Sequence, residues 1–116
     1  MGSRVQEFNE FRERMNERIL REKNRTIQRF FGVDTLTYQD GALPARTKEM
    51  LGLVASMVLR CDDCVAYHIK RCLQYGVTPD EFFDLFSVAL TVGGSIVIPH
   101  LRRAVAFLDE LLNETT

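Results

Sequence analysis

The stretch KEMLGLVASMVLRCDDCVAYH, from Lys48 to His68, decides the fold of this 116-residue chain. Its first half is helix-forming and apolar on nearly every side after Glu49. A proline suits the first turn of a helix, where its missing N–H is not needed, so we predict a helix from Pro44 to Arg60. A second helix is expected from about Cys61 to Tyr75, closed by a glycine cap at Gly76. A helix that is apolar on most sides must be covered by several neighbours.

Patterns outside this stretch also predict helices. Apolar residues recur mostly at three- and four-residue steps over 5–31, which predicts one amphipathic N-terminal helix that Gly32 ends. Thr78-Pro79-Asp80-Glu81 has the form of a capping box and opens a helix that stops at Gly93-Gly94. A last helix is expected from Ser95 or Ile98 to Leu112. No convincing strand pattern occurs, so we predict an all-α domain of about five to six helices. The inward side chains expected on the last helix are Leu101, Ala104, Val105, Leu108 and Leu111 or Leu112.

Composition limits the classes of function. The formal net charge is −1, which gives no general electrostatic reason to bind nucleic acid or an anionic membrane. We find no secretory signal, and the longest apolar run, Met50 to Leu59, is about half of a membrane span. We therefore expect one cytoplasmic domain over 1–116, with no nucleic-acid or membrane partner. A chain of this length can bury only a modest core. Helices that are apolar on nearly every side would therefore complete their burial in a homo-oligomer.

The chemistry expected of this chain lies in Cys61, Cys64 and His68. Residues three and four apart share one face of a helix, so the three side chains project to the same side. Two cysteines at this spacing can close a disulfide without moving the backbone. Cys64 is the better candidate for the activated thiol, because the helix N-terminus and His68 both favour its thiolate. Cys61 would then form the disulfide with it, and no metal or cofactor is expected to take part.

Two other interpretations of these residues stay open. A zinc site could use Cys61, Cys64 and His68, but Cys72 lies too far along the helix to complete it, and His100 is the only other histidine. The cysteines could also be small buried apolar residues with a structural role. Cys72 on its own fits that structural interpretation best.

Glu49 begins the apolar helix with no obvious charge partner other than its basic neighbours in sequence. If the chain turns back near Arg60 and the two helices lie antiparallel, Glu49 comes closer to His68 than to Cys61. A buried carboxylate against the imidazole would orient the ring and complete a proton relay from Cys64 through His68 to Glu49. The alternative is a surface carboxylate in the first turns of a helix.

The run Lys48 to Ser56, followed by Cys61-Asp62-Asp63-Cys64 and His68, resembles the carboxymuconolactone decarboxylase family, in particular its alkylhydroperoxidase D (AhpD)-like branch. The signature of that branch is Glu, eleven residues, Cys-x-x-Cys, three residues, His. In this chain Glu49, Cys61, Cys64 and His68 match it at every step. The resemblance covers about 41–112, including the helix start at Thr78. The N-terminal helix matches only in being helical.

The resemblance implies an all-helical homotrimer or homohexamer that acts as a thiol-disulfide oxidoreductase with alkylhydroperoxidase activity, a peroxiredoxin-type antioxidant function. Its substrate would be a hydroperoxide, and its electron partner a peroxiredoxin or a lipoyl or other thiol donor. Cys64 would be the peroxide-reactive thiol and Cys61 its disulfide partner, with His68 and Glu49 as the proton relay.

One difference from the family concerns the residue before the second cysteine, which is a histidine in the characterised peroxidases and Asp63 here. We expect the acidic pair Asp62 and Asp63 to raise the pKa of the neighbouring thiols. One alternative function is a carboxymuconolactone decarboxylase-like lyase, or another acid-base enzyme, that works with His68 and Glu49. The other is a helical oligomerisation or ligand-binding module without enzymatic activity.

Overall fold

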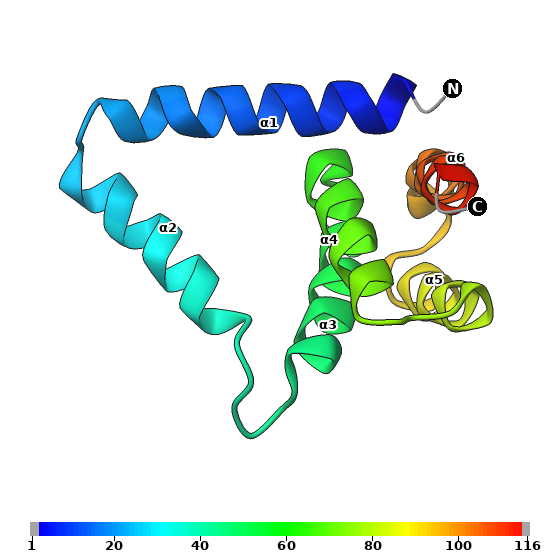
Figure 1. Cartoon of the computed structure of the whole chain (residues 1–116). Helices are drawn as coiled ribbons and strands as arrows, with labels where there is room; N and C mark the ends of the chain where they lie inside the picture. Colours follow the sequence, from blue (N-terminus) through cyan, green and yellow to red (C-terminus); the bar gives the residue numbers. More distant parts are fainter. Residues whose placement is uncertain (1–2, 115–116) are drawn as a thin grey trace.

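The computed structural model describes residues 3–114 and is built of helices joined by short turns (Figure 1). This part of the chain contains no strand, which confirms the all-α prediction. The elements are α1 (Ser3–Arg21), α2 (Arg25–Thr37), α3 (Ala45–Val58), α4 (Asp62–Gln74), α5 (Pro79–Gly93), the short 3-10 helix η1 (Ser95–Val97) and α6 (Ile98–Glu114).

Helices α3 and α4 form an antiparallel hairpin at the centre of the fold. The chain reverses at Arg60, whose left-handed backbone (φ 61°) lets the Cys61 N–H donate to the Ser56 carbonyl at 3.0 Å. At the far end of the hairpin, the Arg46 guanidinium donates to the Tyr75 carbonyl at 3.2 Å. The antiparallel arrangement expected from a turn near Arg60 is therefore present.

The start of α5 has the cap that its sequence predicts. The Thr78 hydroxyl accepts a hydrogen bond from the Glu81 N–H at 3.2 Å, and the Glu81 carboxylate accepts one from the Thr78 N–H at 2.9 Å. At the other end, Gly94 has a positive φ of 84° and leads into η1 and α6. Helices α5 and α6 thereby pack beside the central hairpin.

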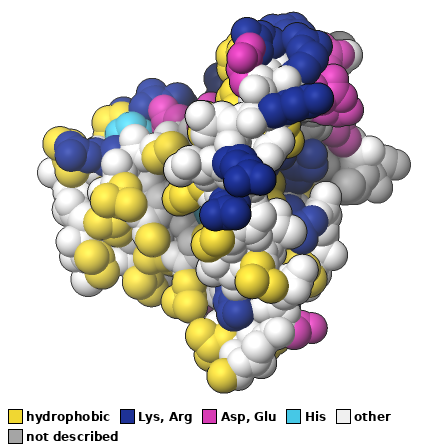
Figure 2. Space-filling model, turned by 90° about the vertical axis from the view of Figure 1, so that its left-hand side faces the viewer, with side chains coloured by type: hydrophobic (Ala, Val, Ile, Leu, Met, Phe, Trp, Pro, Cys, Tyr) yellow, Lys and Arg dark blue, Asp and Glu magenta, His cyan; other side chains and the backbone are white. Residues whose placement is uncertain are grey.

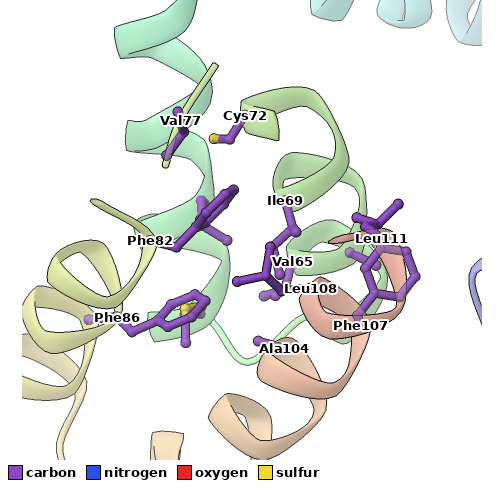
Figure 3. Close-up of a cluster of buried hydrophobic side chains, with 14 of the residues drawn as sticks. Val65, Ile69, Cys72, Val77, Phe82, Phe86, Ala104, Phe107, Leu108 and Leu111 are labelled. Atoms are coloured by element: carbon purple, nitrogen blue, oxygen red, sulfur yellow. The ribbon is translucent and has the colours of Figure 1, made fainter. Parts of the chain in front are cut away.

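The hydrophobic core lies between α3, α4, α5 and α6 (Figure 3). Side chains from α4, α5 and α6 point toward one another there, and α1 adds the buried Val5 and an edge-to-face contact between Phe8 and Phe107. On α6, Phe107 is buried, although the sequence pattern did not select it. The largest fully buried apolar side chains are those of Phe82, Phe86, Leu53, Met57, Ile69 and Leu108.

The single N-terminal helix predicted over 5–31 is wrong, because the chain breaks between α1 and α2. Lys23 has a left-handed backbone (φ 59°), which interrupts the helix. Asn24 then starts a new helix, since its side-chain oxygen accepts a hydrogen bond from the Ile27 N–H at 3.0 Å. Gly32, the predicted helix end, lies inside α2.

Helix α2 has no buried residue and stands apart from the core (Figure 1). Apolar side chains are also exposed on α3, α5 and η1, and Figure 2 shows many of them over one face. The most exposed of these apolar side chains belong to Phe30, Val33, Leu36, Leu59 and Val92.

Within residues 3–114, no helix is long and apolar enough to cross a membrane.

Gly52 of α3 allows α4 to approach closely. A β-carbon at position 52 would lie 2.6 Å from Cε1 and 2.8 Å from Nε2 of the His68 ring, and 2.9 Å from the Tyr38 hydroxyl oxygen. These distances are shorter than normal van der Waals contacts. Glycine is therefore required at this position for His68 to take its place between the helices.

We predict that Gly52→Ala lowers the free energy of unfolding by about 1–3 kcal/mol, because the added methyl group overpacks against the buried imidazole. Urea unfolding followed by circular dichroism would measure the change. Gly32→Ala is the matched control, because nothing lies within 4 Å of a β-carbon there. This control should be neutral or stabilising by up to about 1 kcal/mol. Equal unfolding midpoints for the two variants would contradict the prediction.

Candidate active site

A buried carboxylate and a buried imidazole meet between α3 and α4. Oε1 of Glu49 lies 2.8 Å from Nδ1 of His68, and Glu49 is 0% exposed. The carboxylate oxygen accepts a hydrogen bond from Nδ1–H, which leaves Nε2 as the nitrogen free to accept a proton. The expected contact between Glu49 and His68 is confirmed, and the alternative of a surface carboxylate is wrong.

Arg71 lies on the other side of the same carboxylate. Its Nε is 3.5 Å from Oε2 of Glu49, one helical turn beyond His68 on α4. The guanidinium also donates to the Gln74 side chain at 2.7 Å and lies over the Tyr75 ring. The Glu49 carboxyl group therefore lies between an imidazole and a guanidinium, whose positive charge offsets part of the cost of its burial, although Oε2 of Glu49 and Nε of Arg71 form no hydrogen bond.

Cys61 and Cys64 are joined by a disulfide at the N-terminus of α4, with their Cα atoms 5.3 Å apart. Cys61 is the N-cap residue, and its sulfur accepts a hydrogen bond from the Cys64 N–H at 3.2 Å. Cys64 is exposed, as a sulfur that reacts with an external molecule must be. The pairing expected for a redox-active Cys-x-x-Cys is thus present in its oxidised form.

Two tyrosines surround the imidazole. The rings of Tyr38 and Tyr67 each lie 5.3 Å from the His68 ring, measured between centroids. Partial burial, and then the Glu49 carboxylate, raise the pKa of both phenols above the ordinary value. Both therefore remain neutral hydroxyl groups at physiological pH, available as hydrogen-bond donors.

The Cys64 sulfur and His68 open onto one cleft of about 750 Å³ between α1, α4 and α6. Its lining is mainly apolar, with aromatic side chains such as Phe8 and Phe107 opposite the Cys-x-x-Cys helix. In the described part of the chain no hydrogen bond joins His68 to Cys64, whose sulfur is bonded to Cys61. The cleft can hold an apolar molecule against both groups.

Asp62, which follows Cys61, points toward α6. Its two oxygens lie 2.7 Å from Nδ1 of His100 and 2.8 Å from Nε of Arg103. Although burial works to raise the pKa of Asp62, the hydrogen bonds from His100 and Arg103 outweigh it and hold the pKa below its usual value. Asp62 is therefore not an unpaired negative charge beside the sulfurs, and the effect expected of Asp62 and Asp63 on the pKa of the thiols stays a prediction.

The zinc alternative finds no support in residues 3–114, where no group of three His, Cys, Asp or Glu side chains could hold a metal ion. Cys72 is fully buried in the core. Burial, and then the Glu49 carboxylate, raise the pKa of its thiol to about 12. Cys72 is therefore an inert core residue.

Sequence reasoning missed four groups of the site. Arg71 could have been found, because it follows His68 by three residues on the same helix face. Tyr67 could also have been found, because it directly precedes His68 in the chain. Tyr38 is the residue after α2 and Arg103 lies on α6, and no local pattern links them to the Cys-x-x-Cys helix.

Comparison with solved structures gives a close match to a Thermotoga maritima protein. Two crystal structures of it are 51% and 52% identical to this chain, with TM-scores of 0.91 and 0.87. They cover 94% and 92% of this chain, and 96% and 91% of their own. That protein is described as a carboxymuconolactone decarboxylase family protein with a suggested part in the antioxidative response. A family protein from Legionella pneumophila shares the fold at 18% identity, with a TM-score of 0.84 over 92% of this chain and 96% of its own.

Among curated proteins, an uncharacterised protein of Cupriavidus necator is 30% identical over 82 residues, which make up 71% of this chain and 73% of the relative. The family model of the carboxymuconolactone decarboxylase family matches residues 25–107. The match begins at α2, upstream of the start near residue 41 expected from the sequence. This chain belongs to the carboxymuconolactone decarboxylase family.

Proposed function

We propose that the protein is an AhpD-like thiol-disulfide oxidoreductase that reduces organic hydroperoxides. The observation that carries the proposal is the Cys61–Cys64 disulfide beside an apolar cleft that His68 also lines. The buried Glu49 fixes the imidazole with Nε2 available for proton transfer. The antioxidative part suggested for the similar Thermotoga maritima protein supports the same class of reaction.

The reaction begins with the reduced protein, in which His68 accepts the proton of the Cys64 thiol. The thiolate attacks the O–O bond of the hydroperoxide, so that an S–O bond forms and the O–O bond breaks. The leaving alkoxide takes the proton back from His68 and departs as an alcohol. Cys64 is left as a sulfenic acid, oxidised by two electrons.

The Cys61 thiol then attacks the sulfenic sulfur. The S–S bond forms, and the hydroxyl group leaves with the thiol proton as water. A dithiol donor returns two electrons and two protons by thiol-disulfide exchange and restores both thiols. A lipoyl group or another dithiol would serve as that donor, and a peroxiredoxin would be a partner that accepts electrons from the reduced Cys pair.

We propose that the protein works as a homotrimer or homohexamer. Helix α2 buries no side chain in the monomer, and an isolated helix of its length is only marginally stable in water. Association would cover the exposed apolar side chains of α2, α3 and α5. It would also hold Tyr38, at the end of α2, against His68.

Substitution of the cysteines tests the reaction directly. With a dithiol donor, Cys64→Ser should abolish hydroperoxide turnover, and Cys61→Ser should reduce it sharply because the sulfenic acid is no longer resolved. Cys72→Ala is the matched control and should retain turnover, since its thiol is buried and inert. Mild peroxide should remove two hydrogens from the intact protein, mapped by mass spectrometry to the Cys61–Cys64 pair.

Turnover that survives loss of both cysteines would contradict the peroxidase assignment. If that activity were directed at a lactone and depended on His68 and Glu49, the lyase alternative would replace it. Two thiols that react slowly and form no disulfide would instead indicate a binding module without redox function.

Substitution of the relay residues tests proton transfer. His68→Gln should lower kcat/KM by about 100-fold or more, because the general base and acid is lost. Glu49→Gln should lower it by about tenfold, because the amide holds the ring but does not stabilise the imidazolium form. Stopped-flow oxidation of the reduced protein would measure both rates. Glu81→Gln preserves the form of the capping box and should leave the rate unchanged. A wild-type rate in His68→Gln would exclude the relay.

A further inference from the structure

The proposed reaction leaves one titratable cluster unused, at the contact between α4 and α6. Its members are Asp62, His100 and Arg103. The Asp62 carboxylate accepts from Nδ1 of His100 at 2.7 Å and from Nε of Arg103 at 2.8 Å. The two basic side chains also lie against each other, with Nη2 of Arg103 3.3 Å from Nδ1 of His100. The His100 side chain is only 17% exposed, whereas those of Asp62 and Arg103 are 44% and 51% exposed, so the imidazole is the shielded member of the cluster.

The cluster lies next to the sulfurs. Asp62 directly follows Cys61 in the chain and is the first residue of α4, between the two cysteines. Arg103 lines the cleft together with Asp63 and the exposed Cys64. Asp62 from α4 and Arg103 from α6 are the charged groups that contact the His100 imidazole among the described residues. Asp63 faces the same cleft without belonging to the cluster.

A charge beside the Cys pair affects the reaction rate, because the thiolate is the reactive form of the thiol. A carboxylate close to a thiol disfavours the thiolate, whereas a guanidinium or imidazolium favours it. Asp62 alone would therefore oppose the effect of the helix N-terminus on Cys64. The Arg103 guanidinium offsets the negative charge of Asp62, and His100 donates a hydrogen bond to the same carboxylate.

We propose that His100 and Arg103 are positioning residues of the redox site. By compensating the charge of Asp62, they favour the thiolate form of the Cys pair. This inference rests on the proposed thiol-disulfide function.

The sign of each substitution separates this role from a purely structural one. Loss of either basic group leaves Asp62 less compensated and should disfavour the thiolate. Loss of the carboxylate leaves the basic groups uncompensated and should favour it. If the cluster served only to hold α4 against α6, all three substitutions would break the same contacts and shift the thiols in the same direction.

The test compares His100→Gln, Arg103→Gln and Asp62→Asn in the full-length reduced protein. The rate of Cys64 carboxamidomethylation is measured from pH 5 to 9 by peptide mass spectrometry, and Cys72 stays silent because it is buried. We expect the two basic-residue variants to raise the pH midpoint by about half a unit, which makes the reaction about threefold slower below the midpoint. Asp62→Asn should lower the midpoint by a similar amount.

Arg46→Gln is the matched control, because it removes an ion pair of 2.7 Å with Glu81 that joins two other helices away from the sulfurs. Its midpoint should equal that of the wild type. Arg103→Gln changes a half-exposed side chain, and circular dichroism would verify that its helices are intact. Shifts of one sign in all three variants, or no shift in any, would overturn the inference. Peroxide turnover that depends on Cys64 would still stand in that case, so the two proposals fail separately.

Discussion

The buried hydrogen bond between the Glu49 carboxylate and the His68 imidazole is the constraint on which the rest of the site depends. A carboxylate with no exposed surface is costly unless a partner compensates its charge, so α3 and α4 must pair in the register that brings His68 and Arg71 to it. That register requires a close approach, and Gly52 provides the space. The same hairpin carries the Cys-x-x-Cys turn at its tip. The packing of α3 on α4 therefore positions both the carboxylate–imidazole contact and the two cysteines.

Much of the fold could be predicted because its signals are local. The capping box at Thr78, the turn near Arg60 and the apolar helix after Glu49 depend on neighbouring residues, and the structure contains each of them. The break at Lys23 was missed because Ile19 and Ile27, eight residues apart, stay in phase on one helix face although the residues from Arg21 to Thr26 are all polar. Asn24 gives only a short-range cap signal. Propensity alone does not reveal a left-handed lysine.

The candidate site was predictable in part for the same reason. The spacing from Glu49 to His68 fixes which residues meet within a hairpin, and the disulfide partners are three residues apart. Tyr38 and Arg103 reach the site from separate helices whose docking depends on the whole core. No period or motif in the sequence encodes those contacts, so only a three-dimensional structure shows them.

The groups that contact Glu49 and His68 all lie between Tyr38 and Arg71, which has a consequence for folding. Contacts over short chain separations close small loops and lose little conformational entropy. The α3–α4 hairpin can therefore form early and cooperatively, before α1 and α6 arrive from opposite ends of the chain. The contacts of the acid-base half of the site are thus local in the chain, whereas the cleft is completed only by the docking of α1 and α6.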